Sequence, residues 1–265
     1  MYHKEPFELT TVVGIAPLPG TARYQGESIS SIVDAAVEEA VQYAEAGIDS
    51  IILQNINDWP AREHVDIETV AYLSAIGSAV RRAVGSSCRL GISVLRNDGE
   101  AAVAVAHAVG AQFIRAKIYV GAMLSANGIE MGCMDGVLSL RQKIGSDVEI
   151  WADIRSRTAV PLVEYPILQE CGFAAEKGMC RSFLLSGGDM AQVLETAQCV
   201  KQAFPNHRVI LGGGVNLNNL EQVMANADGA IVASCLKQDG RMHAPIDPVR
   251  LENFMRCYRA AIGHR

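Results

Sequence analysis

The sequence predicts an α/β protein built as a single (β/α)8 TIM barrel, with residues 1–265 forming one domain. Three observations point to this fold class: a length of 265 residues, an aliphatic composition, and an eightfold alternation of short apolar runs with segments of helical period. Barrels of this kind commonly span about 250 residues in one domain. Two ordinary domains would also fit the length, so the prediction of a single barrel depends on the alternation of strands and helices.

The composition indicates a large, well-buried core. Hydrophobic residues make up 49% of the chain, charged residues 20% and aromatic residues 6%, so most of the apolar side chains are aliphatic. Such a chain has too much apolar surface to remain disordered. The net charge is −6, and we therefore expect no nucleic-acid partner, because phosphate contacts call for an excess of clustered cations.

The eight aliphatic runs are continuous rather than alternating, which is typical of strands buried on both faces of a parallel sheet. They span residues 12–16, 50–53, 90–95, 113–118, 149–154, 182–185, 208–211 and 229–233. A doubly wound open sheet would also be built from such strands, but no Gly-x-Gly-x-x-Gly follows the first run. We therefore favour the closed barrel.

Segments with helical period separate these runs. In the first, apolar residues from Ile29 to Val41 form one stripe, whereas Asp34 and Glu38 lie on the opposite side. We predict helices at residues 29–41, 66–84, 98–109, 135–144, 163–177, 190–203, 217–225 and 248–262. Strand and helix thus alternate eight times.

The cysteines, the first residues and the most apolar run indicate in which cellular compartment the protein is expected. Seven cysteines include no Cys-x-x-Cys pair, which favours reduced thiols in a cytoplasmic protein. The first eight residues contain two carboxylates and no apolar run, unlike a signal peptide. The most apolar run, residues 101–114, is shorter than the roughly 18 residues that cross a bilayer, so we expect no membrane span.

The active site of a (β/α)8 barrel lies at the C-terminal ends of its strands. In the fourth predicted strand Arg115, Lys117 and Tyr119 alternate, so we expect all three on the face that lines the barrel. Two buried cations need an anion, and Asp153, which shares a face of the fifth strand with Arg155, is the expected partner. An internal ion-pair layer that merely fills the barrel would give the same pattern.

Further polar residues follow neighbouring strands. Arg96 and Asn97 come directly after the third strand, and Asn55 comes after the second. For Asp98 we favour the role of helix N-cap. With Arg115, Lys117, Arg155 and Arg157, Arg96 is expected to make the mouth of this acidic protein locally cationic.

A glycine triplet gives the sharpest signal. Gly212, Gly213 and Gly214 follow the seventh strand, and Ser234 follows the eighth. Glycines let backbone N–H groups converge on an anion, and the loops after strands seven and eight hold phosphate in many barrels. We therefore expect a phosphorylated small-molecule ligand.

Metal ligands are not evident. Only His64 and His243 lie in loops that could reach the mouth, and no histidine and carboxylate pair falls at ligand spacing. We predict no cofactor, and a divalent metal has no support in the sequence.

At these positions the chain resembles the BtpA/SgcQ family of ribulose-phosphate-binding barrels, from about Val13 to Pro248. The most distinctive matches are Pro17-Leu18-Pro19-Gly20 and Leu95-Arg96-Asn97-Asp98. The resemblance implies a (β/α)8 barrel. It also implies a poorly defined activity, because one branch is linked to photosystem I biogenesis and another lies among sugar-metabolism genes and is described as nucleosidase-like.

Four polar positions depart from the family pattern. The family has Glu-Asn, Asn, Lys-His and Gly-Thr-Ser where this chain has Gln54-Asn55, Lys117, Arg157-Thr158 and Ala233-Ser234-Cys235. These departures cluster where substrate is expected, so the resemblance transfers the fold and the location of the site but not the substrate.

We expect an enzyme, namely a lyase, an isomerase or a nucleosidase-like glycosidase acting on a phosphorylated sugar or nucleoside-like small molecule. Asp153 would serve as general acid or base, and the cations Arg96, Arg115 and Lys117 would stabilise developing negative charge. Asn55 and Asn97 would orient hydroxyl groups. In an alternative version, Lys117 is the nucleophile of a Schiff base.

A second hypothesis is a non-catalytic assembly or biogenesis factor of the photosystem I type that binds protein partners. It would expose an apolar patch, which we expect around Trp59 and residues 118–134. We favour the enzyme, because charged residues at three neighbouring strand ends are costly to keep without use. In either case we expect a homo-oligomer, with Trp59 as a candidate contact.

Overall fold

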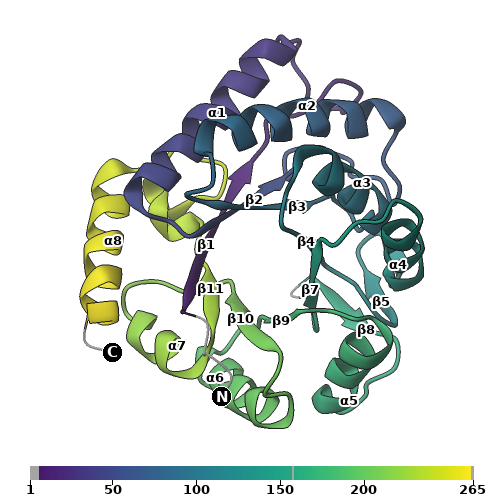
Figure 1. Cartoon of the computed structure of the whole chain (residues 1–265), viewed down its shortest axis with the longest axis vertical. Coiled ribbons are helices and arrows are strands. Elements are labelled where there is room, and N and C mark those ends of the chain that lie inside the picture. Colours follow the sequence, from purple (N-terminus) through teal and green to yellow (C-terminus); the bar gives the residue numbers. More distant parts are fainter. Residues whose placement is uncertain (1–5, 157, 264–265) are drawn as a thin grey trace.

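The computed structural model describes residues 6–156 and 158–263. Within them, eight parallel strands close into a barrel that helices surround, which confirms the predicted fold class (Figure 1). In chain order the barrel strands are β1 (Glu8–Gly14), β2 (Ser50–Gln54), β3 (Arg89–Ser93), β4 (Phe113–Ala116), β7 (Glu149–Asp153), β9 (Ser182–Leu185), β10 (Arg208–Gly212) and β11 (Gly229–Ile231). Each strand pairs with its neighbours in this order, and β11 pairs with β1.

The helices fall where the periodicity places them. They are α1 (Ile29–Ala46), α2 (Ile67–Val84), α3 (Gly99–Val109), α4 (Met134–Lys143), α5 (Ile167–Gly172) with a π-helical turn at Phe173–Lys177, α6 (Met190–Ala203), α7 (Leu220–Asn226) and α8 (Pro248–Gly263). Local chemistry sets their ends. The Ser28 hydroxyl accepts from the Ser31 N–H at the start of α1, and Gly47 ends that helix in the left-handed conformation. Within the described ranges, no helix has the length and apolar character needed to cross a bilayer.

The first strand begins four residues earlier than predicted, at Glu8 rather than residue 12. The prediction missed this part because Glu8, Thr10 and Thr11 are polar, yet all three are buried. Glu8 pairs with Arg89 and Arg208, and the hydroxyl of Thr10 lies 2.7 Å from that of Ser50. Partners inside the barrel therefore offset the cost of burying Glu8 and Thr10.

The bottom of the barrel is closed by four charged side chains. Glu8, Arg89, Glu149 and Arg208 come from alternate strands, as the side-chain layers of such barrels do. Arg89 bridges Glu8 at 2.9 Å and Glu149 at 2.7 Å. This plug lies at the N-terminal ends of the strands, where it contributes to stability rather than to chemistry.

An apolar layer lies above the plug. Its central feature is a stacked pair, Phe113 and Trp151, with ring centroids 3.9 Å apart. Gly91 makes room for this pair, because a Cβ there would lie only 2.2 Å from the Phe113 ring. The layer contains Val12, Ile52, Phe113, Trp151, Leu184, Ile210 and Ile231. It forms the floor of the cavity described below.

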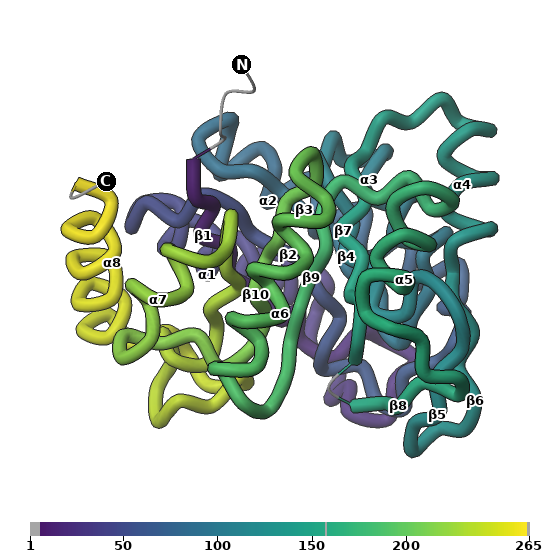
Figure 2. The backbone as a smooth tube through the Cα atoms, turned by 90° about the horizontal axis from the view of Figure 1, so that it is seen from below, coloured from purple at the N-terminus to yellow at the C-terminus, as the bar shows by residue number. Residues whose placement is uncertain are grey.

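A second, three-stranded sheet was not predicted. It consists of β5 (Ala122–Ser125), β6 (Gly128–Met131) and β8 (Ala159–Pro161), in the order β6-β5-β8. Because its strands come from the loops after β4 and β7, the sheet lies beside the barrel at the end where the barrel strands finish (Figure 2).

Candidate functional site

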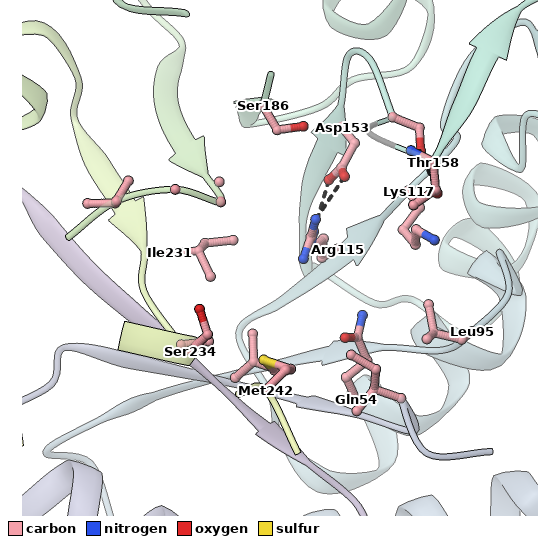
Figure 3. Close-up of a pocket in the computed structure, with 18 residues that line it drawn as sticks. Gln54, Leu95, Arg115, Lys117, Asp153, Thr158, Ser186, Ile231, Ser234 and Met242 are labelled. Atoms are coloured by element: carbon pink, nitrogen blue, oxygen red, sulfur yellow. Dashed lines mark hydrogen bonds and ion pairs between the residues drawn. The ribbon is translucent and has the colours of Figure 1, made fainter. Parts of the chain in front are cut away.

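A cavity of about 560 Å³ opens above the apolar floor, at the C-terminal ends of the barrel strands. Strand ends and the loops after them contribute its walls, as expected for the active end of such a barrel (Figure 3). Its lining consists of Val12, Gln54, Ile56, Leu95, Arg115, Lys117, Asp153, Ser156, Thr158, Ser186, Gly212, Gly213, Gly214, Val215, Ile231, Ala233, Ser234 and Met242. Seven of the ten predicted catalytic and phosphate-binding residues are therefore brought together.

Arg115 and Asp153 form a paired charge in the cavity wall. The Nε and Nη2 atoms of Arg115 each donate to one carboxylate oxygen of Asp153, both at 2.9 Å. The side chain of Asp153 is 4% exposed and that of Arg115 is 17% exposed. The two parallel bonds fix both groups, and the carboxylate retains lone pairs for a further partner.

Lys117 lies directly after β4 and is held differently. Among the described residues, no hydrogen bond or ion pair within 4.0 Å holds its ammonium group. Burial lowers the pKa of Lys117 below its usual range, the charge of Asp153 opposes this, and the charge of Arg115 adds to it. The side chain is therefore a weakly held amine in a half-buried position.

The glycine loop follows β10, which lies two strands from β7 and three from β4 around the barrel. Gly213 and Gly214 both have φ of 79°, a conformation that favours glycine. The side-chain amides of Asn216 and Asn219 each donate to the Gly214 carbonyl oxygen at 2.9 Å, which fixes the loop. Gly213 follows the last pair of the β10–β11 ladder, Gly212 with Ile231, so its N–H is directed toward Ile231. Within the described ranges, the backbone N–H groups of Gly214 and Val215 have no protein acceptor.

Ser234 begins a short 3-10 turn, Ser234–Leu236, after β11. Among the residues that the structure describes, the N–H groups of Ser234 and Cys235 also lack a protein acceptor. Gly214 and Ser234 are exposed and Cys235 is half-buried, so these N–H groups are open to water or to a ligand in the cavity. Two adjacent loops therefore present unsatisfied donors to one cavity.

The other three predicted catalytic residues lie outside the cavity lining. Asn55 is 1% exposed, accepts from the Leu95 N–H at 2.7 Å and donates to Asp58 at 3.0 Å. Asn97 accepts from the Ile118 N–H at 2.9 Å and donates to the Ile118 carbonyl at 2.7 Å. Both amides thus hold the loop after β3 in place.

Arg96, the third of these residues, extends toward Glu130 of β6, 3.8 Å away. Its charge is near enough to Lys117 to lower the pKa of that lysine slightly, after the stronger effects of burial, Asp153, Arg115 and Glu130. Asp98 is the N-cap of α3, as predicted, since it accepts from the Ala101 N–H at 2.9 Å.

The alternation of side chains between the two faces of a strand does not continue past the strand ends. β4 ends at Ala116 and β7 ends at Asp153, so the period of two no longer holds for Tyr119 and Arg155. Tyr119 is buried behind the barrel wall with its hydroxyl donating to the Gly178 carbonyl, and Arg155 pairs with Glu170 at 3.2 Å. Arg157 lies outside the described residues.

Several lining residues were given no catalytic or binding role from the sequence. Gln54, at the end of β2, donates to the Ser93 hydroxyl at 3.1 Å, and its position at a strand end could have identified it. The hydroxyl residues Ser156, Thr158 and Ser186 come from the loops after β7 and β9, which carry no distinctive motif. In the described ranges, no three His, Cys, Asp or Glu side chains are arranged to hold a metal.

Relatives and solved structures place this chain among known barrels. The photosystem I biogenesis protein BtpA of Synechocystis sp. is 33% identical over 92% of this chain and 85% of its own length. The uncharacterized protein TK2179 of Thermococcus kodakarensis is 34% identical over 93% of each chain.

The structural neighbours share the fold. N-(5′-phosphoribosyl)anthranilate isomerase from Pyrococcus furiosus has a TM-score of 0.54 at 16% identity, and it covers 96% of this chain and 99% of its own. A phosphoribosyl anthranilate isomerase in complex with reduced 1-(o-carboxyphenylamino)-1-deoxyribulose 5-phosphate has a TM-score of 0.56 at 11% identity, over 96% and 99% of the two chains. The sequence profile described as the BtpA family matches residues 7–260, and this chain belongs to that family.

Proposed function

We propose that the protein is an enzyme, a lyase, isomerase or glycosidase, that acts on a phosphorylated sugar or nucleoside-like small molecule. The loops after β10 and β11 hold the phosphate, and the charged groups after β4 and β7 act on the rest of the ligand.

The observation that carries the proposal is the set of unsatisfied donors on one side of the cavity. Gly214 and Val215 supply N–H groups from one loop, and Ser234 and Cys235 supply them from the next, none with a protein acceptor in the described ranges. A phosphate oxygen accepts several such bonds at once, and the hydroxyl of Ser234 adds a further donor.

The charged groups at the ends of β4 and β7 supply the chemistry. Asp153 is oriented by Arg115 and takes or gives the proton, while Arg115 and Lys117 stabilise negative charge on the reacting oxygen. Asn55 and Asn97 act indirectly, because their contacts fix the loop after β3 whose Leu95 lines the cavity. Arg96 adds positive charge near Lys117.

The names of the structural neighbours agree with this class of ligand. One is an isomerase named for a phosphoribosyl substrate, and another is in complex with a 1-deoxyribulose 5-phosphate derivative. At such low sequence identity, the similarity to these structures supports the fold alone. The proposal of a phosphate site therefore depends on the backbone donors in this chain.

Thermal denaturation tests the phosphate site. Inorganic phosphate or ribulose 5-phosphate at about ten times its Kd is expected to raise Tm by about 3 °C. Gly214→Ala is expected to remove most of this rise, because a side chain at φ 79° strains the loop. Gly172→Ala is the matched control, since Gly172 is helical and nothing lies within 4 Å of its added Cβ. An unchanged Tm with both ligands at millimolar concentration would contradict the proposal.

A second candidate function, the binding of a protein partner, is favoured by an exposed apolar surface. In the three-stranded sheet, Leu124 lies directly opposite Ile129 on β6 and Val160 on β8. These side chains are 46%, 58% and 62% exposed. Trp59 is also exposed, with the Arg23 guanidinium 5.7 Å from its ring centroid. Contiguous apolar surface of this kind commonly marks an interaction site.

We propose self-association through this sheet face, in line with the expected homo-oligomer. Replacing Leu124 and Val160 together with Glu is expected to convert the oligomer to a monomer in light scattering coupled to size exclusion. Arg82→Glu on the outer side of α2 is the charge-changing control. If the wild-type protein is a monomer, the proposal of self-association is wrong. The exposed sheet face would then be available to a different protein partner, as the assembly-factor hypothesis requires.

A further inference from the structure

The cavity offers few groups that could form a covalent bond with a ligand. Among its described lining residues there is no His, Cys or Tyr, and the four hydroxyl residues have no adjacent imidazole to activate them. Cys235 neighbours the cavity, but burial raises the pKa of its thiol to about 11, so it is protonated near neutral pH. Lys117 is the remaining nucleophile.

The surroundings of Lys117 favour the neutral amine. Asp153 is the carboxylate of the cavity lining, and both its oxygens already accept from Arg115. Arg115 and Arg96 add positive charge near the lysine, while Glu130 and Asp153 oppose them. An amine without a fixed counter-ion, beside two guanidinium groups and half removed from water, loses its proton more readily than a surface lysine.

The barrel geometry places this amine opposite the phosphate donors. Lys117 follows β4 and Ser234 follows β11, and these strands are four positions apart in a closed barrel of eight. Figure 3 shows the two side chains on opposite sides of the cavity, with Arg115 and Asp153 in between. A ligand anchored by its phosphate at Ser234 therefore extends toward Lys117.

We infer that Lys117 forms a Schiff base with the carbonyl carbon of a ketose or aldose phosphate whose phosphate occupies the proposed anion site. The inference rests on the proposed function and narrows it to a lyase or an isomerase, because an iminium ion stabilises a carbanion at the neighbouring carbon.

The step balances with groups of the cavity and water. The lone pair of neutral Nζ attacks the carbonyl carbon and forms the C–N bond, while the C=O π electrons move to oxygen, which takes the proton that nitrogen releases. Asp153, carrying the proton that the Lys117 ammonium group gave up to become the neutral amine, then protonates the hydroxyl of this carbinolamine. Water leaves, the C–O bond breaks, and the nitrogen lone pair completes the cationic C=N bond. Asp153, now a carboxylate, is placed to remove a proton from the ligand.

Reductive trapping tests the inference. The full-length protein is incubated with ribulose 5-phosphate or dihydroxyacetone phosphate in the presence of sodium borohydride, and intact mass and peptide mapping locate the secondary amine. We expect one adduct, at Lys117, and its loss in Lys117→Met. Lys143→Met is the matched control, because Lys143 is exposed on α4 and its removal leaves the adduct. Ribitol 5-phosphate, which has no carbonyl group, is expected to raise Tm without forming an adduct.

The outcomes separate this inference from the proposed function. A rise in Tm with the sugar phosphates but no adduct, or equal adduct in Lys117→Met, overturns the Schiff base and leaves the phosphate site standing. No rise in Tm with any of the three phosphates, together with no adduct, overturns both.

Discussion

Asp153→Asn is expected to lower kcat by about 10²- to 10⁴-fold, which is the usual contribution of a positioned general acid or base. The amide has almost the shape of the carboxylate and can still accept one bond from Arg115, but it cannot take up a proton. If Lys117 forms a Schiff base, the same substitution slows loss of water from the carbinolamine. The measurement is kcat on the first sugar phosphate that the wild-type protein converts.

A surface carboxylate provides the control for this variant. Asp147 is exposed in the turn before β7, and Asp147→Asn is expected to leave kcat unchanged. Near-wild-type kcat in Asp153→Asn, with the barrel still folded by circular dichroism, would show that Asp153 is a structural partner of Arg115 and would remove it from the mechanism.

The second large effect concerns stability. Asp153→Leu is expected to lower the free energy of unfolding by about 3 kcal/mol, because it leaves the Arg115 guanidinium largely buried without its charge partner. Arg115 is 17% exposed toward the cavity, so some hydration remains and the loss falls at the low end of the range for buried pairs.

A double-mutant cycle isolates this coupling. Adding Arg115→Met to Asp153→Leu removes the uncompensated cation, and we expect the double variant to recover most of the loss in urea denaturation. Additive losses from the two single variants would mean that the two bonds at 2.9 Å contribute little to folding.

Most of the barrel could be predicted from the sequence because its strands are buried on both faces and its helices are amphipathic. Residues 208–211, for example, read as a continuous aliphatic strand and form most of β10. The same reasoning found the glycine triplet, Ser234 and Asp153, since position after a strand determines position at the mouth. The start of β1 was not predicted, because its buried polar residues Glu8, Thr10 and Thr11 leave no hydrophobic signal.

The parts of the structure that could not be predicted depend on contacts between residues distant in the sequence, which no local sequence pattern encodes. β5 and β6 are four residues each and alternate between buried and exposed side chains, so they lack the continuous apolarity of the barrel strands. The amides of Asn55 and Asn97 were predicted to face substrate. Their bonds go instead to backbone groups of Leu95 and Ile118, which are distant in the sequence.

A crystal structure of the protein soaked with ribulose 5-phosphate tests the central claim most directly. We predict phosphate oxygens within hydrogen-bonding distance of the N–H groups of Gly214, Val215 and Ser234, with the sugar extending toward Lys117 and Asp153. Phosphate bound elsewhere, with these N–H groups bonded only to water, would contradict the account.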